Sequence, residues 1–141
     1  MDLKKFFLEQ GFPEETLKTP PEVVLTLGLS PQRVRAALAV VSDGRPLLVA
    51  DYAPGAVRSR LRGLLAYARL AFPRKPPPLI LQTNGQEFAL AEVASGKEIA
   101  YGGPEVLPPW EALKNWPAPP PVERRRLPIE EKVLFIHSTG G

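Results

Sequence analysis

The sequence predicts an α/β domain in which a mixed central sheet is flanked by helices. Short apolar runs bounded by glycine and proline surround one long helical pattern. The predicted order is a helix, two hairpin strands, a long helix and three further strands, which favours a mixed sheet with one crossover helix. A chain of 141 residues is long enough for one such core.

The N-terminal part predicts a short helix and a β-hairpin. Residues 3–10 have apolar side chains at helical spacing. Residues 22–29 are apolar and rich in valine, which predicts a strand. Two more apolar runs, residues 33–41 and 46–52, surround Asp43-Gly44, a dipeptide typical of two-residue hairpin turns.

A central helix and three later strands complete the predicted sheet. Residues 79–84 begin with a continuous apolar run, residues 79–81, as expected of a central strand covered on both faces. Residues 86–94 and 97–103, separated by Ser95-Gly96, predict an antiparallel meander. The helix is predicted over residues 56–72, and its buried face comprises Val57, Leu61, Leu64, Ala68 and Phe72.

The chain is predicted to divide near residue 103. Residues 1–103 form the α/β domain, and residues 104–141 form a proline-rich arm that packs on the core or on a partner. We expect Trp110, Leu113 and Trp116 to pack on the core. Residues 129–137 are apolar enough to dock as a helix or strand, on this chain or on a partner.

Composition excludes several classes of site. The absence of cysteine excludes disulfides and thiolate metal sites, and the single histidine, His137, argues against histidine-built ones. No glycine-rich phosphate loop, membrane-spanning run or signal peptide is evident, so we expect a cytoplasmic protein without membrane association. Its 18 prolines and its preference for arginine are thermophile-like.

Basic residues concentrate in the middle of the chain. Residues 33–75 contain nine basic residues and two acidic ones, Asp43 and Asp51. Such a distribution suits a surface that faces a polyanion. Arginines that only solvate an exposed helix and hairpin would give the same pattern.

Three short features follow one another along the chain: A-P-G at residues 53–55, a tyrosine at residue 67 and T-N-G at residues 83–85. In this order they resemble the N-terminal nuclease domain of type I restriction enzyme R subunits, in the PD-(D/E)xK superfamily, where the tyrosine belongs to a helical Q-x-x-x-Y motif. The resemblance covers residues 33–101. It implies a restriction-endonuclease-like sheet and a site where Asp and Glu hold a divalent ion beside a Lys.

The catalytic groups of that family are missing from the matching positions. Alanine cannot ligate magnesium, and a neutral phenol lacks the charge of an ammonium group. A shift by one residue would place Asp51 at the carboxylate position and Ala53 at the lysine position, but it would turn each side chain to the other sheet face. Ala37 stands where the family has Asp, and Ala50 stands where it has Glu. Tyr52 stands at the position of the Lys, and Gly63 at the position of the Gln.

We therefore expect a catalytically inactive restriction-endonuclease-like domain that binds DNA without sequence specificity or acts as an accessory module, with no metal or other cofactor. Two alternatives remain open. One is a protein-interaction or homo-oligomerisation module that uses residues 104–141, and the other is a divergent Mg²⁺-dependent nuclease that uses Asp51. The expected nucleic-acid contacts are Arg33, Arg35, Arg58, Arg62, Tyr67 and Arg69.

Overall fold

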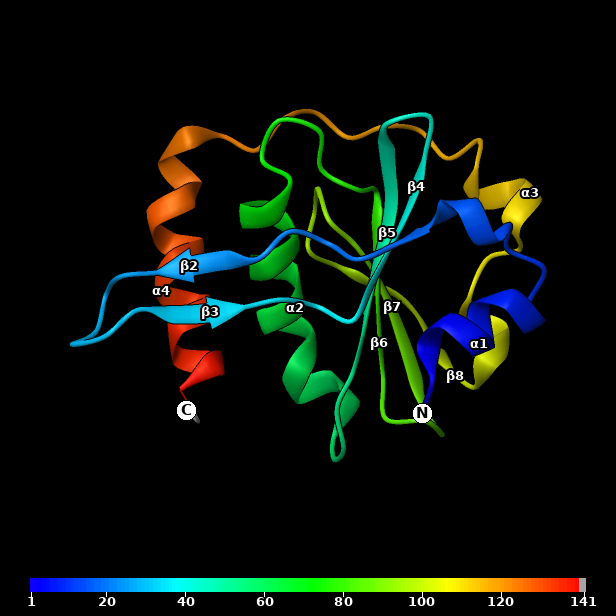
Figure 1. The fold of residues 1–141 in the computed structure, drawn as a ribbon, viewed down its shortest axis with the longest axis horizontal. Helices are drawn as coiled ribbons and strands as arrows, with labels where there is room; N and C mark the ends of the chain where they lie inside the picture. The colour runs from blue at the N-terminus through cyan, green and yellow to red at the C-terminus, as the bar shows by residue number, and fades with distance from the viewer. Residues whose placement is uncertain (140–141) are drawn as a thin grey trace.

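A six-stranded mixed sheet with flanking helices forms the centre of the molecule, which confirms the predicted α/β class (Figure 1). The computed structural model describes residues 1–139. Strands follow the order β1-β4-β5-β6-β7-β8, and β2 and β3 form a separate two-stranded ribbon. Within residues 1–139, no helix is long and apolar enough to cross a membrane.

The predicted hairpin and crossover build the middle of the sheet. Strands β4 (Leu38–Ser42) and β5 (Arg45–Tyr52) are antiparallel, and Asp43 and Gly44 between them have φ values of 52° and 75°. Positive φ at both central residues is what a type I′ turn requires. Helix α2 (Val57–Ala71) then returns the chain, so that β6 (Leu79–Thr83) pairs with β5 in parallel.

The remaining strands extend the sheet on both sides. Every residue of β6 is buried, including the polar Gln82 and Thr83, as expected of a central strand covered on both faces. Strands β7 (Phe88–Glu92) and β8 (Glu98–Gly102) continue as an antiparallel meander. On the other side, β1 (Leu17–Lys18) pairs with β4 after a 3₁₀ turn, η1 (Glu14–Thr16).

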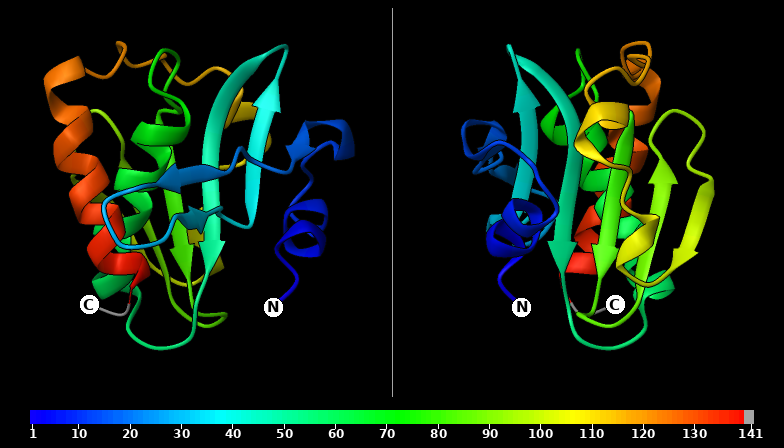
Figure 2. Two further views of the ribbon diagram at one scale, coloured as in Figure 1. Left: turned by 60° about the vertical axis from the view of Figure 1, so that its left-hand side comes forward. Right: turned by 90° about the vertical axis from the view of Figure 1, so that its right-hand side faces the viewer.

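Helices cover both faces of the sheet. Helix α1 (Leu3–Glu9) and the short α3 (Trp110–Leu113) lie on one face, and α2 lies on the other (Figures 1 and 2). Helix α4 (Leu127–Ser138) packs against α2 on the side away from the sheet. Two 3₁₀ turns, η2 (Pro104–Val106) and η3 (Arg124–Arg126), lie in the segments that lead to α3 and α4.

The strand predicted over residues 33–41 is wrong as one element. It is divided into β3 (Gln32–Val34) and β4, because β3 pairs with β2 (Val23–Leu25) in the ribbon that lies across α2 and α4 (Figure 2). Between them the backbone N–H of Ala37 donates to the Asp51 carboxylate rather than to a neighbouring strand. The strand predicted over residues 22–29 is correspondingly short.

Helix α2 is buried on more than the one predicted stripe. Residues 63–69 are all buried, because the sheet covers one side of the helix and α4 covers another. The C-terminal segment also contributes to the core: Leu107 and Leu113 join the cluster between the sheet and α1, and Leu134 joins the cluster around α2. Trp110 and Trp116 pack against the first cluster, as expected.

Candidate functional site

A pocket of about 160 Å³ lies beside the carboxyl ends of the parallel strands β5 and β6. Ligands of open α/β sheets commonly bind at such strand ends. Helix α2, helix α4 and the bend after β3 supply the other walls, so the pocket joins segments that are far apart in the sequence. We call it the Asp51 pocket; its lining includes Arg35, Asp51, Arg60, Tyr67, Gln82 and His137.

Asp51 is the only acidic side chain among the residues that line this pocket. Its Oδ1 accepts a hydrogen bond of 3.0 Å from the backbone N–H of Ala37. Burial raises the pKa of the Asp51 carboxyl, while hydrogen bonds from Ala37 and Tyr52 and the positive charge of Arg60 oppose that rise. The carboxylate is therefore held in place at a cost in solvation.

The side chains that face the pocket do not follow the register set by A-P-G. Ala50 lies in the core cluster on the α1 side of the sheet, and Tyr52 and Ala37 are exposed and outside the pocket lining. Asp51 and Ala53 line the pocket instead, together with Gly63 and Tyr67 of α2. Asp51 and Ala53, the positions given by the one-residue shift, therefore line the same pocket as Gly63 and Tyr67 of α2.

Helix α4 occupies the space beside Gly63. A Cβ atom at Gly63 would stand 2.9 Å from Cγ and Nδ1 of His137, so a glutamine at this position requires the His137 side chain or α4 to shift. Sequence reasoning missed Gln82, His137 and Ser138 as pocket residues. No local motif marks them, because only the packing of α4 on α2 brings the last two to the site.

Two of the predicted DNA-contacting arginines are exposed but already paired with acids. Arg33 bonds Glu22 at 2.8 Å. Arg58 bonds Glu98 through two N–H groups at 2.8 and 2.9 Å and lies over the ring of Tyr101, 3.9 Å from its centre. This pairing holds the pKa of Glu98 below its usual range. Two of the nine basic residues counted in residues 33–75 are thus paired with acids of the same chain.

Arg69, predicted to contact nucleic acid, is buried and cannot do so in this fold. It is 4 % exposed, donates to Glu130 at 2.8 Å, and also donates to the carbonyl oxygen of Val93. Arg62 is half-buried and bonds the other oxygen of Glu130, which is itself fully buried. These two arginines join α2 to α4 instead of forming an exposed basic stripe.

Tyr67, expected to stack on a base, also lacks an accessible ring face. It is 2 % exposed, and its hydroxyl donates to the backbone carbonyl of Pro21. Burial raises the pKa of Tyr67 to about 12. Its place is fixed by the segment that leads into the β2–β3 ribbon, which covers α2.

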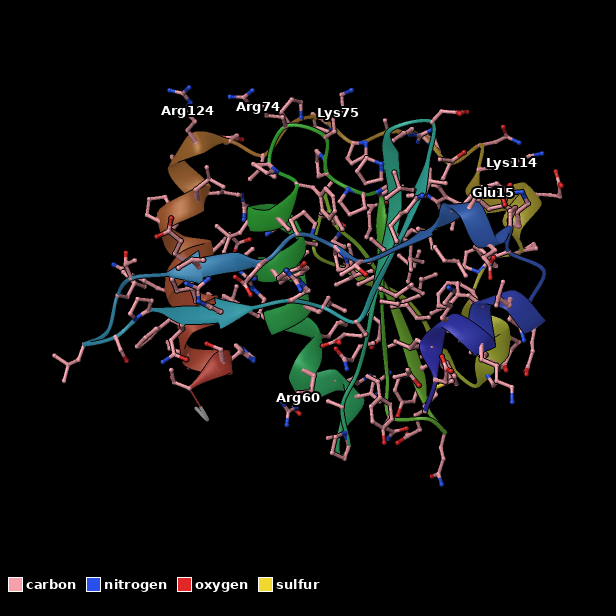
Figure 3. The ribbon with its side chains drawn as sticks, viewed as in Figure 1. Glu15, Arg60, Arg74, Lys75, Lys114 and Arg124 are labelled. Carbon is pink, nitrogen blue, oxygen red and sulfur yellow. The ribbon has the colours of Figure 1, made fainter. Side chains whose placement is uncertain are left out.

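Arg35, one of the predicted contacts, is exposed at the pocket, and so is Arg60, which is not among them. Neither forms an ion pair within residues 1–139. Figure 3 shows Arg60 at the N-terminal end of α2, directed away from the core. Among the described residues, no three His, Asp or Glu side chains are grouped so that they could hold a metal ion. The site thus combines one carboxylate with two cations.

Searches of protein-family models, curated proteins and solved structures found no match to this chain.

Replacing Asp51 with asparagine is expected to raise the free energy of unfolding at pH 7. The raised pKa means that the folded protein holds this proton more tightly than the unfolded chain, so stability is lost as pH rises and the carboxyl ionises. Asparagine avoids that loss and keeps an oxygen for the Ala37 N–H. Urea unfolding at about pH 3, where both states keep the proton, should show little difference.

The exposed Glu15 provides the control, since Glu15→Gln removes one negative charge outside the pocket from a side chain that forms no ion pair within residues 1–139. A lower stability of Asp51→Asn at pH 7 would contradict this account, because it would mean that the hydrogen bonds and the charge of Arg60 outweigh the cost of burying the carboxylate.

Proposed function

We propose that the chain is a catalytically inactive, restriction-endonuclease-like module that binds nucleic acid through phosphate contacts. The observation that carries this proposal is the Asp51 pocket, which has one carboxylate, Asp51, and alanine at residue 53, where the shifted register expects a lysine. The pocket therefore lacks the second carboxylate that a two-carboxylate metal site needs. It also lacks the lysine whose ammonium group would stabilise the charge of the reacting groups.

The packing around Gly63 also supports an inactive role. In the family that this chain resembles, a glutamine stands at the corresponding helix position, four residues before the tyrosine. Here His137 of α4 fills that space. Because α4 packs against the part of α2 that contains Gly63, we expect this region to have a structural role and not to turn over a substrate.

Arg35 and Arg60 support the nucleic-acid part of the proposal. Both are exposed at the pocket, and neither forms an ion pair among the described residues. Contacts of this kind provide affinity without sequence specificity, and the affinity falls as salt rises.

The test is fluorescence anisotropy of labelled DNA titrated with the protein at about 50 and 200 mM salt. We expect binding that weakens steeply between the two concentrations. The absence of binding at the lower salt concentration, or affinity unchanged by salt, would exclude phosphate-based recognition.

A protein-interaction module is the second candidate. Ile129 and Ile136, seven residues apart on α4, are each 56 % exposed, and the loop between β2 and β3 exposes Leu27 and Leu29. The tryptophans of the C-terminal segment face the chain's own core, so an interface would use the outer face of α4 instead. A mass that rises with concentration in light scattering would favour this candidate, and a constant monomer mass would exclude self-association.

A further inference from the structure

Two basic segments that are about fifty residues apart in the sequence lie side by side at one edge of the molecule. The backbone N–H of Val122 donates to the carbonyl of Pro73 at 2.8 Å, which places residues 122–126 beside the loop after α2. In Figure 3, the side chains of Arg74, Lys75 and Arg124 extend from the same edge into solvent. We call the region formed by these two segments the basic edge; its cations are Arg74 and Lys75 in one segment and Arg124, Arg125 and Arg126 in the other.

The charge of the basic edge is only slightly neutralised. All five cations are exposed. Glu123 is the one acid of these two segments, and it bonds Arg125 at 2.6 Å. The edge therefore keeps the positive charge that Arg33, Arg58, Arg62 and Arg69 have lost to internal ion pairs. A concentrated, exposed positive charge attracts phosphate groups.

An open apolar groove of about 400 Å³ adjoins these cations. Its lining includes Arg74 and Lys75 together with apolar residues, which are Val41, Pro46, Ala71, Pro73 and the half-buried Phe72. A groove lined by both apolar side chains and cations matches single-stranded nucleic acid, whose bases are available for apolar contact while its phosphates meet cations. A duplex hides its bases within the stack.

The backbone around the edge is stiffened by proline. Residues 76–78 and 119–121 are consecutive prolines on either side of the contact between the two segments. Because proline restricts φ, the backbone segments that carry these cations lose little conformational entropy on binding.

We propose that the basic edge and its groove bind single-stranded nucleic acid. The proposal rests on the function proposed above, because the ligand class is the same, but it assigns the main contact to the end of α2 opposite the Asp51 pocket. Phosphates meet Arg74, Lys75 and the arginines of η3, and bases enter the groove beside Phe72.

The experiment compares four forms of the full chain with labelled single-stranded DNA of about 20 nucleotides at about 50 mM salt. Arg74→Glu/Lys75→Glu is expected to weaken binding at least about tenfold, since it replaces two phosphate contacts with repulsion. Lys5→Glu/Lys97→Glu changes the net charge equally, at exposed lysines outside any ion pair of the described residues, and should change affinity less than about threefold.

The fourth form, Arg35→Glu/Arg60→Glu, separates this proposal from the proposed function. If it loses binding while Arg74→Glu/Lys75→Glu behaves like the lysine control, the basic edge is excluded and nucleic-acid binding at the pocket stands. If wild-type protein binds no DNA, the proposed function fails and the basic edge fails with it. Tighter binding of a duplex of equal length would contradict the role of the groove.

Discussion

Replacing Glu130 with glutamine is expected to lower the free energy of unfolding by about 3–5 kcal/mol. Both carboxylate oxygens of Glu130 are occupied, one by Arg62 and one by Arg69, and the side chain has no exposure to solvent. Glutamine would direct an N–H₂ group at an arginine and leave a buried positive charge without its counter-ion. Such a loss is a large part of the 5–15 kcal/mol typical of a domain.

Urea unfolding at pH 7 measures this effect, and Glu131→Gln is the matched control. Glu131 is the next residue of α4 and forms no ion pair within residues 1–139. A loss below about 1 kcal/mol for Glu130→Gln, in the range of an exposed ion pair, would show that water reaches the cluster and that the arginines do not depend on Glu130.

A chain that ends at residue 103 is expected not to fold cooperatively. It lacks three buried leucines, Leu107, Leu113 and Leu134, whose burial contributes about 1.5–3 kcal/mol each. It also leaves Arg69 buried without Glu130. Together these losses are comparable to the whole stability of a typical domain.

Near-UV circular dichroism and thermal melting report this outcome, with a chain that ends at Thr139 as the control. The control should melt as the full chain does. A cooperative melt of residues 1–103, within a few degrees of the full chain, would contradict the prediction and would support a domain boundary near residue 103.

Local turn chemistry and periodicity made much of the fold predictable. Asp43-Gly44 favours a type I′ turn whatever surrounds it, and the apolar run of β6 needs cover on both faces. The break between β3 and β4 was not predictable in this way. Residues 35–37 end the ribbon because Ala37 bonds Asp51, a side chain 14 positions later in the chain.

The candidate site was predicted only in part, because its accessibility depends on tertiary packing. Periodicity places Arg69 and Tyr67 on the flanks of a helix, but it carries no information about α4 and the ribbon, which cover those flanks. Glu130, the partner of Arg69, lies 61 residues away in sequence. The adjacency of residues 73–75 to residues 124–126 also depends on packing, since one long-range backbone hydrogen bond joins their segments.

The fate of DNA bound by the protein in the presence of Mn²⁺ tests the central claim most directly. Labelled DNA from the anisotropy titration is incubated with the metal, and its length is then measured on a denaturing gel. We predict DNA that is bound and remains intact, because the Asp51 pocket has one carboxylate and no lysine. Cleavage by wild-type protein that is lost in Asp51→Ala would contradict the claim and would identify a divergent metal-dependent nuclease.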